Sequence, residues 1–240
     1  MDLKLTDQVA VIVGAERGIG RAIAEAFVAE GCGVGLIDRG AEIESAAGEI
    51  AGRTDRKVCA AIADVADEDA VRKAAESLHE QLGRIDHVVF TAAIGSGKFG
   101  FPFWNLESFD WSRVLEVNLL GAVHTAHAFS PFLVEQKSGT LLFFVSVAAQ
   151  IGSPTDPPYS ASKAGVLNFM QCAARDLAPY GVRVNAISPG MVKTALNESV
   201  WASSQKNLPD EEKQDYETWA RDKIAKISPL GRWQEPDEFG

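Results

Sequence analysis

The sequence is poor in cysteine and in positive charge, and it lacks long apolar runs. Its three cysteines, Cys32, Cys59 and Cys172, stand far apart in apolar surroundings. They are typical of small buried hydrophobic residues rather than of a disulfide framework or a metal site. The net charge is −10 with no concentrated basic stretch, which argues against a surface for nucleic acid or anionic membranes. No apolar run reaches the ~18 residues of a membrane span.

The N-terminus also lacks the features of a secretion signal. The segment "MDLKLTDQVAVIVG" has no basic region followed by a long apolar core, and it leads directly into a strand pattern. We therefore expect a cytoplasmic, reducing location. Apolar residues make up 46% of the chain and charged residues 23%, which is ordinary for a soluble globular protein.

Short β-branched and apolar runs alternate with helical patterns along most of the chain. Such alternation predicts an α/β fold of the Rossmann type, with a doubly wound parallel sheet and helices on both faces. We find no repeat and no linker, so residues 1–240 are expected to form one domain. The predicted strands cover 8–13, 33–38, 57–64, 85–90, 139–146 and 182–188, and the predicted helices cover 18–31, 41–51, 67–83, 108–135 and 160–181.

The pattern changes between residues 190 and about 230, where the chain becomes polar with isolated Trp201 and Trp219. An insertion of this length in a compact domain is usually a lid or a binding loop with some helix of its own. A surface excursion anchored by the two tryptophans is the alternative. Its position after the carboxyl end of a strand favours a substrate lid, because open α/β sheets bind ligands there.

A glycine-rich turn joins the first strand to the first helix. Gly14, Gly18 and Gly20 allow a tight turn and a close approach of the backbone to a pyrophosphate at the helix N-terminus. A plain strand–helix turn is the alternative, but the position after the first strand is the one that the motif requires. The turn therefore predicts a dinucleotide site.

Acidic residues end the second and third predicted strands. Asp38 could hydrogen-bond the adenosine ribose and repel a 2′-phosphate, which favours NAD over NADP. Arg17 and Arg39 weaken this preference, because either could accept a 2′-phosphate. Asp64, with Val65, could meet the adenine, or Asp64 could cap the following helix.

The segment "PYSASKAGV" places Tyr159 four residues before Lys163, and so on one face of a helix. A free phenol, with a pKa of ~10, is a poor base near neutrality. Lys163 and a cationic oxidised nicotinamide could together lower that pKa, so that Tyr159 takes a hydroxyl proton in oxidation and returns it in reduction. An exposed surface pair is the alternative if the motif stood alone.

Other motifs accompany it in order, and together they make the sequence resemble the short-chain dehydrogenase/reductase family, in its shorter, single-domain branch. The resemblance runs from Gln8 to the C-terminus. The motifs are Gly14-x-x-x-Gly18-x-Gly20, Asp38, Asp64-Val65, "VNLLG" with Asn118, "FFVSVAAQIG" with Ser146, Tyr159-x-x-x-Lys163 and "VRVNAISPG" followed by Thr194.

The resemblance implies a catalytic set of Asn118, Ser146, Tyr159 and Lys163. Ser146 would orient the substrate oxygen beside Tyr159, and Lys163 would also hold the nicotinamide ribose. Asn118 would interrupt its helix and hold a water that relays protons from Lys163 to solvent. The nicotinamide carboxamide would face Ile187 or Thr194. The cofactor residues implied are Gly14, Arg17, Gly18, Ile19, Gly20, Asp38, Asp64, Val65, Ala92, Tyr159, Lys163, Pro189, Gly190, Val192 and Thr194.

The chain departs from the family pattern in three places, of which the first is Val13, where the family usually has threonine before the first glycine. The family's Asn-Asn-Ala-Gly segment is here Phe90-Thr91-Ala92-Ala93, so Phe90 cannot tie its strand to neighbours, although Thr91 could do so in part. The family's last strand, beyond "SPLGRWQEPDEFG", is absent, which indicates either a fragment or a differently completed sheet. We expect six parallel strands, with an exposed or partner-covered edge in place of the seventh.

The substrate is predicted only as a class. Phe99, Phe101, Phe103 and Trp104 could line a pocket, although we expect at least two of them to pack the loop onto the core. Gln150, with Ser146 and Tyr159, could face the substrate, and the lid tryptophans would suit a ring or a mixed polar–apolar alcohol.

The predicted function is NAD-dependent interconversion of a secondary alcohol and a ketone. The alternatives are an NADPH-dependent 3-ketoacyl-type reductase and a non-catalytic dinucleotide-binding protein. We expect no metal, since His124 and His127 lack a third ligand and are interpreted as packing or interface residues. The resemblance also implies a homotetramer or homodimer formed through the two long helices.

Overall fold

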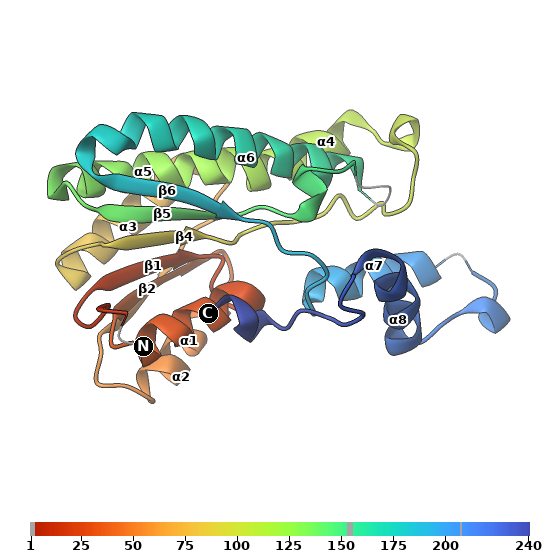
Figure 1. The fold of residues 1–240 in the computed structure, drawn as a ribbon, viewed down its shortest axis with the longest axis horizontal. Coiled ribbons are helices and arrows are strands. Elements are labelled where there is room, and N and C mark those ends of the chain that lie inside the picture. Colours follow the sequence, from red (N-terminus) through yellow and green to blue (C-terminus); the bar gives the residue numbers. More distant parts are fainter. Residues whose placement is uncertain (1–2, 153–155, 207) are drawn as a thin grey trace.

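The computed structural model describes residues 3–152, 156–206 and 208–240, and a six-stranded parallel sheet runs through its centre (Figure 1). The sheet order is β3-β2-β1-β4-β5-β6. It confirms the predicted α/β class with six strands, and the order reverses between β1 and β4, where open α/β sheets form a binding crevice. The strands are β1 (Val9–Val13), β2 (Gly33–Asp38), β3 (Val58–Ile62), β4 (His87–Phe90), β5 (Gly139–Phe144) and β6 (Val182–Ile187).

Helices cover both faces of the sheet, as the apolar residues on both sides of its central strands require (Figure 1). The helices α1 (Gly18–Ala29) and α2 (Glu42–Ala51) bury their apolar residues on one face. On the other face the core is formed by α3 (Glu68–Leu82), α5 (Gly121–Gln136) and α6 (Pro157–Leu177).

The predicted long helix 108–135 is continuous but not uniform. It consists of α4 (Ser108–Leu115), a π-helical turn η2 (Glu116–Leu120) and α5. By length and mean hydropathy alone, the stretch Ser108–Gln136 could cross a membrane. It packs here as a core helix, however, with Phe129 and Leu133 fully buried between α5 and the sheet.

The predicted lid region contains two helices, α7 (Ala195–Gln205) and α8 (Tyr216–Ile227), which extend from the sheet layers (Figure 1). Between them lies the short 3₁₀ turn η5 (Asp210–Glu212). The lid has its own small aromatic core, in which Tyr216 stacks on Trp219 and Trp233, with ring centroids 6.0 and 5.8 Å away. Trp201 meets Tyr216 edge-on at 5.7 Å. Both predicted lid tryptophans therefore stabilise the lid itself.

After the lid, the chain returns to the main body and ends in the 3₁₀ turn η6 (Pro236–Phe239), which packs against α1 (Figure 1). Phe239 contacts Phe144 edge-on, with ring centroids 5.8 Å apart. On the way, Gln234 pairs with Val192 in an isolated parallel bridge. Among the described residues no seventh strand lies beside β6, in agreement with the expected six-stranded sheet.

Candidate active site

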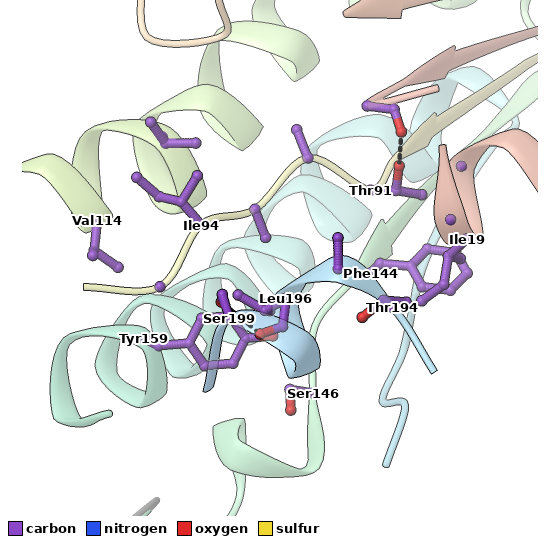
Figure 2. Close-up of a pocket in the computed structure, with 18 of the residues that line it drawn as sticks. Ile19, Thr91, Ile94, Val114, Phe144, Ser146, Tyr159, Thr194, Leu196 and Ser199 are labelled. Carbon is purple, nitrogen blue, oxygen red and sulfur yellow. Dashed lines mark hydrogen bonds between the residues drawn. The ribbon is translucent and has the colours of Figure 1, made fainter. Parts of the chain in front are cut away.

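A cavity of about 1090 Å³ opens at the carboxyl ends of the strands. It extends from the glycine-rich turn after β1, past the ends of β2, β4 and β5, to α6 and the start of α7. Figure 2 shows Ile19 and Thr91 toward one end, and Tyr159 and Ser146 toward the other. The predicted dinucleotide and catalytic residues thus share one continuous site.

The glycine turn has the backbone geometry that a dinucleotide needs. Gly14 and Gly18 have φ angles of +89° and +59°, where a side chain would be strained. At Gly20 a Cβ would clash with the Gly14 carbonyl oxygen and lie 2.6 Å from Thr91 Oγ1. Helix α1 begins after Arg17 without a side-chain cap, so its first amides are free to bind a pyrophosphate. These residues fit a dinucleotide cofactor.

Thr91 connects β4 to the glycine turn by hydrogen bonds, which Phe90 cannot make with its side chain. Its Oγ1 is 2.9 Å from the Val13 carbonyl oxygen and 3.0 Å from that of Gly14, to which it donates. Its amide also donates to the Val13 carbonyl oxygen at 2.8 Å. Phe90 is fully buried and meets Phe143 edge-on, so it contributes to the core in place of a polar tie. This contact resolves the departure seen in the Phe90–Ala93 segment.

We expect the substitution Thr91→Val to loosen the glycine turn, because it keeps the side-chain volume and removes the hydroxyl donor. Dinucleotide affinity should fall about five- to tenfold, and the free energy of unfolding should fall by about 1–2 kcal/mol. Fluorescence titration of a reduced dinucleotide and urea denaturation measure the two effects. Thr91→Ser, which keeps the donor, should remain near wild type, and equal losses in both variants would contradict this role for the hydroxyl.

Asp38 lies at the end of β2 and lines the cavity. Its Oδ2 accepts a hydrogen bond from the Glu16 amide at 3.1 Å, and its Oδ1 accepts one from the Arg39 amide at 2.8 Å. Two backbone donors therefore fix the carboxylate. The Glu16 side chain also lines the cavity and lies so close to Gly40 that a Cβ there would clash with it. Two carboxylates thus border the place expected for the adenosine ribose.

The predicted adenine residues, Asp64 and Val65, line the cavity as well. Asp64 Oδ1 accepts from the Ala66 amide at 3.0 Å, whereas the next helix is capped by Asp67, which accepts from Ala70. The alternative in which Asp64 caps α3 is therefore wrong. Arg17 and Arg39 are exposed, and both line the same end of the cavity.

The three central catalytic candidates meet at the opposite end of the cavity. Ser146 follows β5, is 9% exposed, and accepts a hydrogen bond from the Ala148 amide at 3.1 Å. Tyr159 and Lys163 lie one turn apart near the start of α6, with the Lys163 ammonium 5.7 Å from the Tyr159 ring centroid. Lys163 is 1% exposed and donates to the Phe144 carbonyl oxygen at 2.7 Å. All three line the cavity.

Burial controls the ionisation of both groups on α6. It raises the pKa of Tyr159 to about 12, against an opposing hydrogen bond with Ser146, and the Asp156 charge raises it further. Burial also lowers the pKa of Lys163 to about 7. The expected lowering of the tyrosine pKa by Lys163 is therefore not a property of the protein alone. At neutral pH Tyr159 is a phenol, ready to donate a proton.

Asn118 lies inside the π-helical turn and is fully buried. Its Nδ2 donates to the Ile94 carbonyl oxygen at 2.9 Å and to Ser162 Oγ at 3.0 Å, while its Oδ1 accepts from the Ile94 amide at 2.8 Å. The expected interruption of the helix is thus present as a π-bulge, which is common at functional sites. The side chain ties the loop after β4 to α6.

The loop after β6 lines the cavity with Pro189, Gly190, Val192 and Thr194. Its anchor, which the sequence did not suggest, is Gln234: its side-chain oxygen accepts from the Gly190 amide at 2.7 Å. The Gln234 main chain also exchanges hydrogen bonds with this loop. Ala92 and Ile19 line the cavity as predicted, whereas Ile187 ends β6 outside the lining.

Several substrate predictions are corrected. Gln150 is exposed at the end of a 3₁₀ turn and does not line the cavity. Phe99 lines the cavity. We expected at least two of the four aromatic residues of this loop to pack on the core, but the other three do not. The exposed members are Phe101, Phe103 and Trp104. Nor do Trp201 and Trp219 reach the cavity, whose lid side is lined by Leu196 and Ser199 of α7 (Figure 2).

The two histidines on α5 contact the segment after β3. His124 Nδ1 lies 2.9 Å from the Val65 carbonyl oxygen, and His127 Nδ1 lies 3.5 Å from the Glu68 carboxylate. In the parts of the chain that the structure describes, no group of three or more metal-ligating side chains is found.

Comparison with known proteins is consistent with this geometry. The family model of the short chain dehydrogenases matches residues 8–205. Oxidoreductase UcpA from Salmonella typhimurium is 34% identical over 99% of this chain and 86% of its own length. A 3-oxoacyl-[acyl-carrier-protein] reductase from Synechocystis is 32% identical over 98% of this chain and 86% of its own.

Two solved structures show the same architecture. L-Sorbose reductase from Gluconobacter frateurii, complexed with NADPH and L-sorbose, superposes with a TM-score of 0.89 at 27% identity, covering 99% of this chain and 88% of its own. A NAD⁺-bound xylitol dehydrogenase superposes with a TM-score of 0.87 at 29% identity, covering 98% and 90%.

Proposed function

This chain belongs to the short chain dehydrogenase family, and we propose that it interconverts a secondary alcohol and a ketone with NAD as its cofactor. The observation that carries this proposal is the convergence of Ser146, Tyr159 and Lys163 in one cavity that also contains the glycine turn. Membership of the family implies an oxidoreductase but specifies neither the substrate nor the cofactor. The secondary alcohol and the choice of NAD are our inference. A bound nicotinamide would supply the hydride chemistry.

The protein's own groups supply substrate orientation and the proton. Ser146 would donate a hydrogen bond to the substrate oxygen, beside the Tyr159 hydroxyl. In ketone reduction Tyr159, a phenol at neutral pH, donates its proton to that oxygen. In alcohol oxidation Tyr159 must first lose its proton, so oxidation should accelerate as pH rises. A charged Lys163 would favour the phenolate, because an adjacent cation stabilises it, but burial lowers the Lys163 pKa to about 7, so this effect acts only near or below neutral pH.

The cavity wall beyond these residues is mixed in character. Ile94, Val114 and Leu196 supply apolar surface, and Ser199 supplies a hydroxyl (Figure 2). Such a lining suits an alcohol or ketone with both a carbon skeleton and hydroxyl groups. L-Sorbose, bound in the similar L-sorbose reductase, is a compound of this kind.

We base the NAD preference on charge at the ribose end. Asp38 is fixed by two amides, and Glu16 adds a second carboxylate on the same border of the cavity. A 2′-phosphate placed there would meet two negative charges, whereas ribose hydroxyls can donate to them. We expect NADH to bind at least about tenfold more tightly than NADPH, and fluorescence titration of both measures this. Asp38→Asn should reduce the difference between the NADH and NADPH affinities. Tighter binding of NADPH than of NADH by the wild type would contradict the proposed preference for NAD.

An NADPH-dependent 3-ketoacyl-type reductase is the second candidate. Two observations favour it: Arg17 and Arg39 line the cavity at the ribose end, and one relative is named a 3-oxoacyl-[acyl-carrier-protein] reductase. If NADPH binds more tightly, Arg17→Ala and Arg39→Ala identify which guanidinium holds the 2′-phosphate. Turnover of a 3-ketoacyl thioester would then support this candidate over a simple alcohol.

We also propose a cytoplasmic location and assembly into dimers or tetramers. Exposed apolar residues at the ends of the two long helices support assembly: Leu120, the last residue of η2 before α5, is 45% exposed, and Tyr180, in the 3₁₀ turn after α6, is 44% exposed. Light scattering of the purified chain measures the assembly state.

A further inference from the structure

A buried carboxylate outside the catalytic set stands next to the catalytic tyrosine. Asp156 immediately precedes α6 and is only 4% exposed. Its Oδ1 accepts a hydrogen bond from the Tyr159 amide at 3.4 Å, so that it caps the helix bearing Tyr159 and Lys163. Buried carboxylates are uncommon and need hydrogen-bond partners, so the partner of the second oxygen of Asp156 indicates what this residue holds in place.

That second oxygen holds the loop on the substrate side of the cavity. Asp156 Oδ2 accepts from the Ser96 amide at 2.9 Å. The fit is tight, because a Cβ on Gly95 would lie 2.9 Å from Asp156 Oδ2 and 2.7 Å from the Phe99 ring. The cavity is lined by Gly95, Ser96 and Phe99 at this point. One carboxylate therefore connects the substrate loop to the first turn of the catalytic helix.

Asn118 holds the same loop two residues before Ser96, through both polar atoms of the Ile94 backbone. The loop is thus fixed from two elements, by an amide in the π-helical turn and by a carboxylate at the start of α6. Only the carboxylate carries charge. Its removal should loosen one tie and also change the electrostatic field at Tyr159.

We propose that Asp156 is a positioning residue. It holds the loop Gly95–Phe99 in a fixed position relative to Tyr159, and so fixes the distance between the substrate-lining loop and the proton donor. The proposal rests on the function proposed above for Tyr159. No catalytic contact with the substrate is assigned to Asp156. It acts through the loop on substrate binding and through its charge on the phenol.

The charges around Asp156 define the expected pH effect. Burial raises the pKa of Asp156 most, hydrogen bonds from Ser96 and Tyr159 oppose this, and the charge of Asp110 on α4 raises the pKa further. Lys98 in the loop pairs with Asp110 at 2.7 Å. Lys163 lies farther along α6. Because the Asp156 charge disfavours a neighbouring phenolate, its removal should lower the pKa of Tyr159, and the alkaline limb of alcohol oxidation should move to lower pH.

The test compares wild type with Asp156→Asn, which keeps the volume but loses the charge and one of the two accepted hydrogen bonds. We expect KM for the alcohol to rise about three- to tenfold, with kcat at the pH plateau within about threefold of wild type. The oxidation limb should move down by roughly half to one pH unit. Asp156→Ser should keep the helix cap and still lose the tie to Ser96.

Two readouts do not depend on turnover. Amide hydrogen exchange at residues 94–98 should be faster in both variants than in wild type. Phenolate absorbance at pH 10.5, with the Tyr159→Phe signal subtracted, should rise in Asp156→Asn, from roughly 3% to roughly 24% ionised if the pKa falls by about one unit from about 12. These readouts separate failure of this proposal from failure of the proposed reaction.

Asp67→Asn is the matched control, because Asp67 caps α3 in the same way and does not line the cavity. It should leave KM, the pH limb and exchange at residues 94–98 unchanged. The proposal is overturned if Asp156→Asn leaves loop exchange and the Tyr159 signal at wild-type values, or if it merely lowers stability as Asp67→Asn does. Circular dichroism of each variant establishes that the fold is retained.

Discussion

The substitution Tyr159→Phe should abolish turnover and leave the dinucleotide bound. It removes a single oxygen, the one that exchanges a proton with the substrate, so we expect kcat to fall about a thousandfold or more. The Phe ring keeps the aromatic volume in the cavity wall, and Gly14, Gly18 and Asp38 at the other end of the cavity are untouched. Affinity for the reduced dinucleotide should therefore stay within about twofold.

Tyr180→Phe is the control for this experiment, because Tyr180 is 44% exposed after α6 and does not line the cavity. Initial rates with a panel of secondary alcohols, together with fluorescence titration, measure both quantities. Retention of turnover by Tyr159→Phe would remove Tyr159 from the mechanism. Dinucleotide binding by the wild type, with no turnover of any alcohol, ketone or 3-ketoacyl thioester, would favour the non-catalytic alternative.

Much of the fold could be predicted because the sheet is parallel and buried. The four central strands are almost continuously apolar, and the helical patterns between strands have clear ends, such as Asp67 before α3 and Gly83, with φ of 81°, after it. The order of motifs also indicated the family, and with it the residues of the dinucleotide and catalytic site. The cofactor residues from Gly14 to Thr194 do line one cavity, although more than 170 residues separate them in sequence.

The surroundings of the site were harder to predict, since they depend on contacts distant in sequence. Nothing near Gly190 in the sequence points to Gln234 as its partner, and nothing near Gly95 points to Asp156. The aromatic residues of the lid have no periodicity that distinguishes a ligand pocket from a small core. We expected Trp201 and Trp219 in the lid to suit a ring or a mixed polar–apolar alcohol, but they pack around Tyr216 instead.

The ionisation of the catalytic pair in the protein alone could not be predicted from spacing, and the expected joint effect of Lys163 and an oxidised nicotinamide stays a prediction. A lysine four residues after a tyrosine suggests a cation that lowers the phenol pKa, provided that the lysine is charged. Burial was not visible in the sequence, and it moves both groups toward their neutral forms, with pKa values of about 12 for Tyr159 and about 7 for Lys163. The same burial means that Lys163 lowers the free energy of unfolding.

The substitution Lys163→Met should inactivate the protein and stabilise it. Lys163 is 1% exposed, and burial alone accounts for its lowered pKa. At pH 7 the unfolded chain binds a proton on this amine more readily than the folded chain does, which disfavours folding. A methionine of similar length removes this cost, although the Phe144 carbonyl oxygen loses its donor. We expect a net gain of about 2–3 kcal/mol at pH 7 and a loss of activity of at least about a hundredfold.

The sign of the pH dependence is the sharper part of this prediction. The folded pKa of Lys163, about 7, lies below its ordinary value of 10.5, so the destabilisation is complete below about pH 7 and disappears as pH rises toward 10.5. The advantage of Lys163→Met in urea denaturation should shrink across that window. Lys73→Met, on the exposed side of α3, should show no such trend. A constant difference between Lys163→Met and wild type from pH 7 to 10 would mean that the folded protein keeps Lys163 charged.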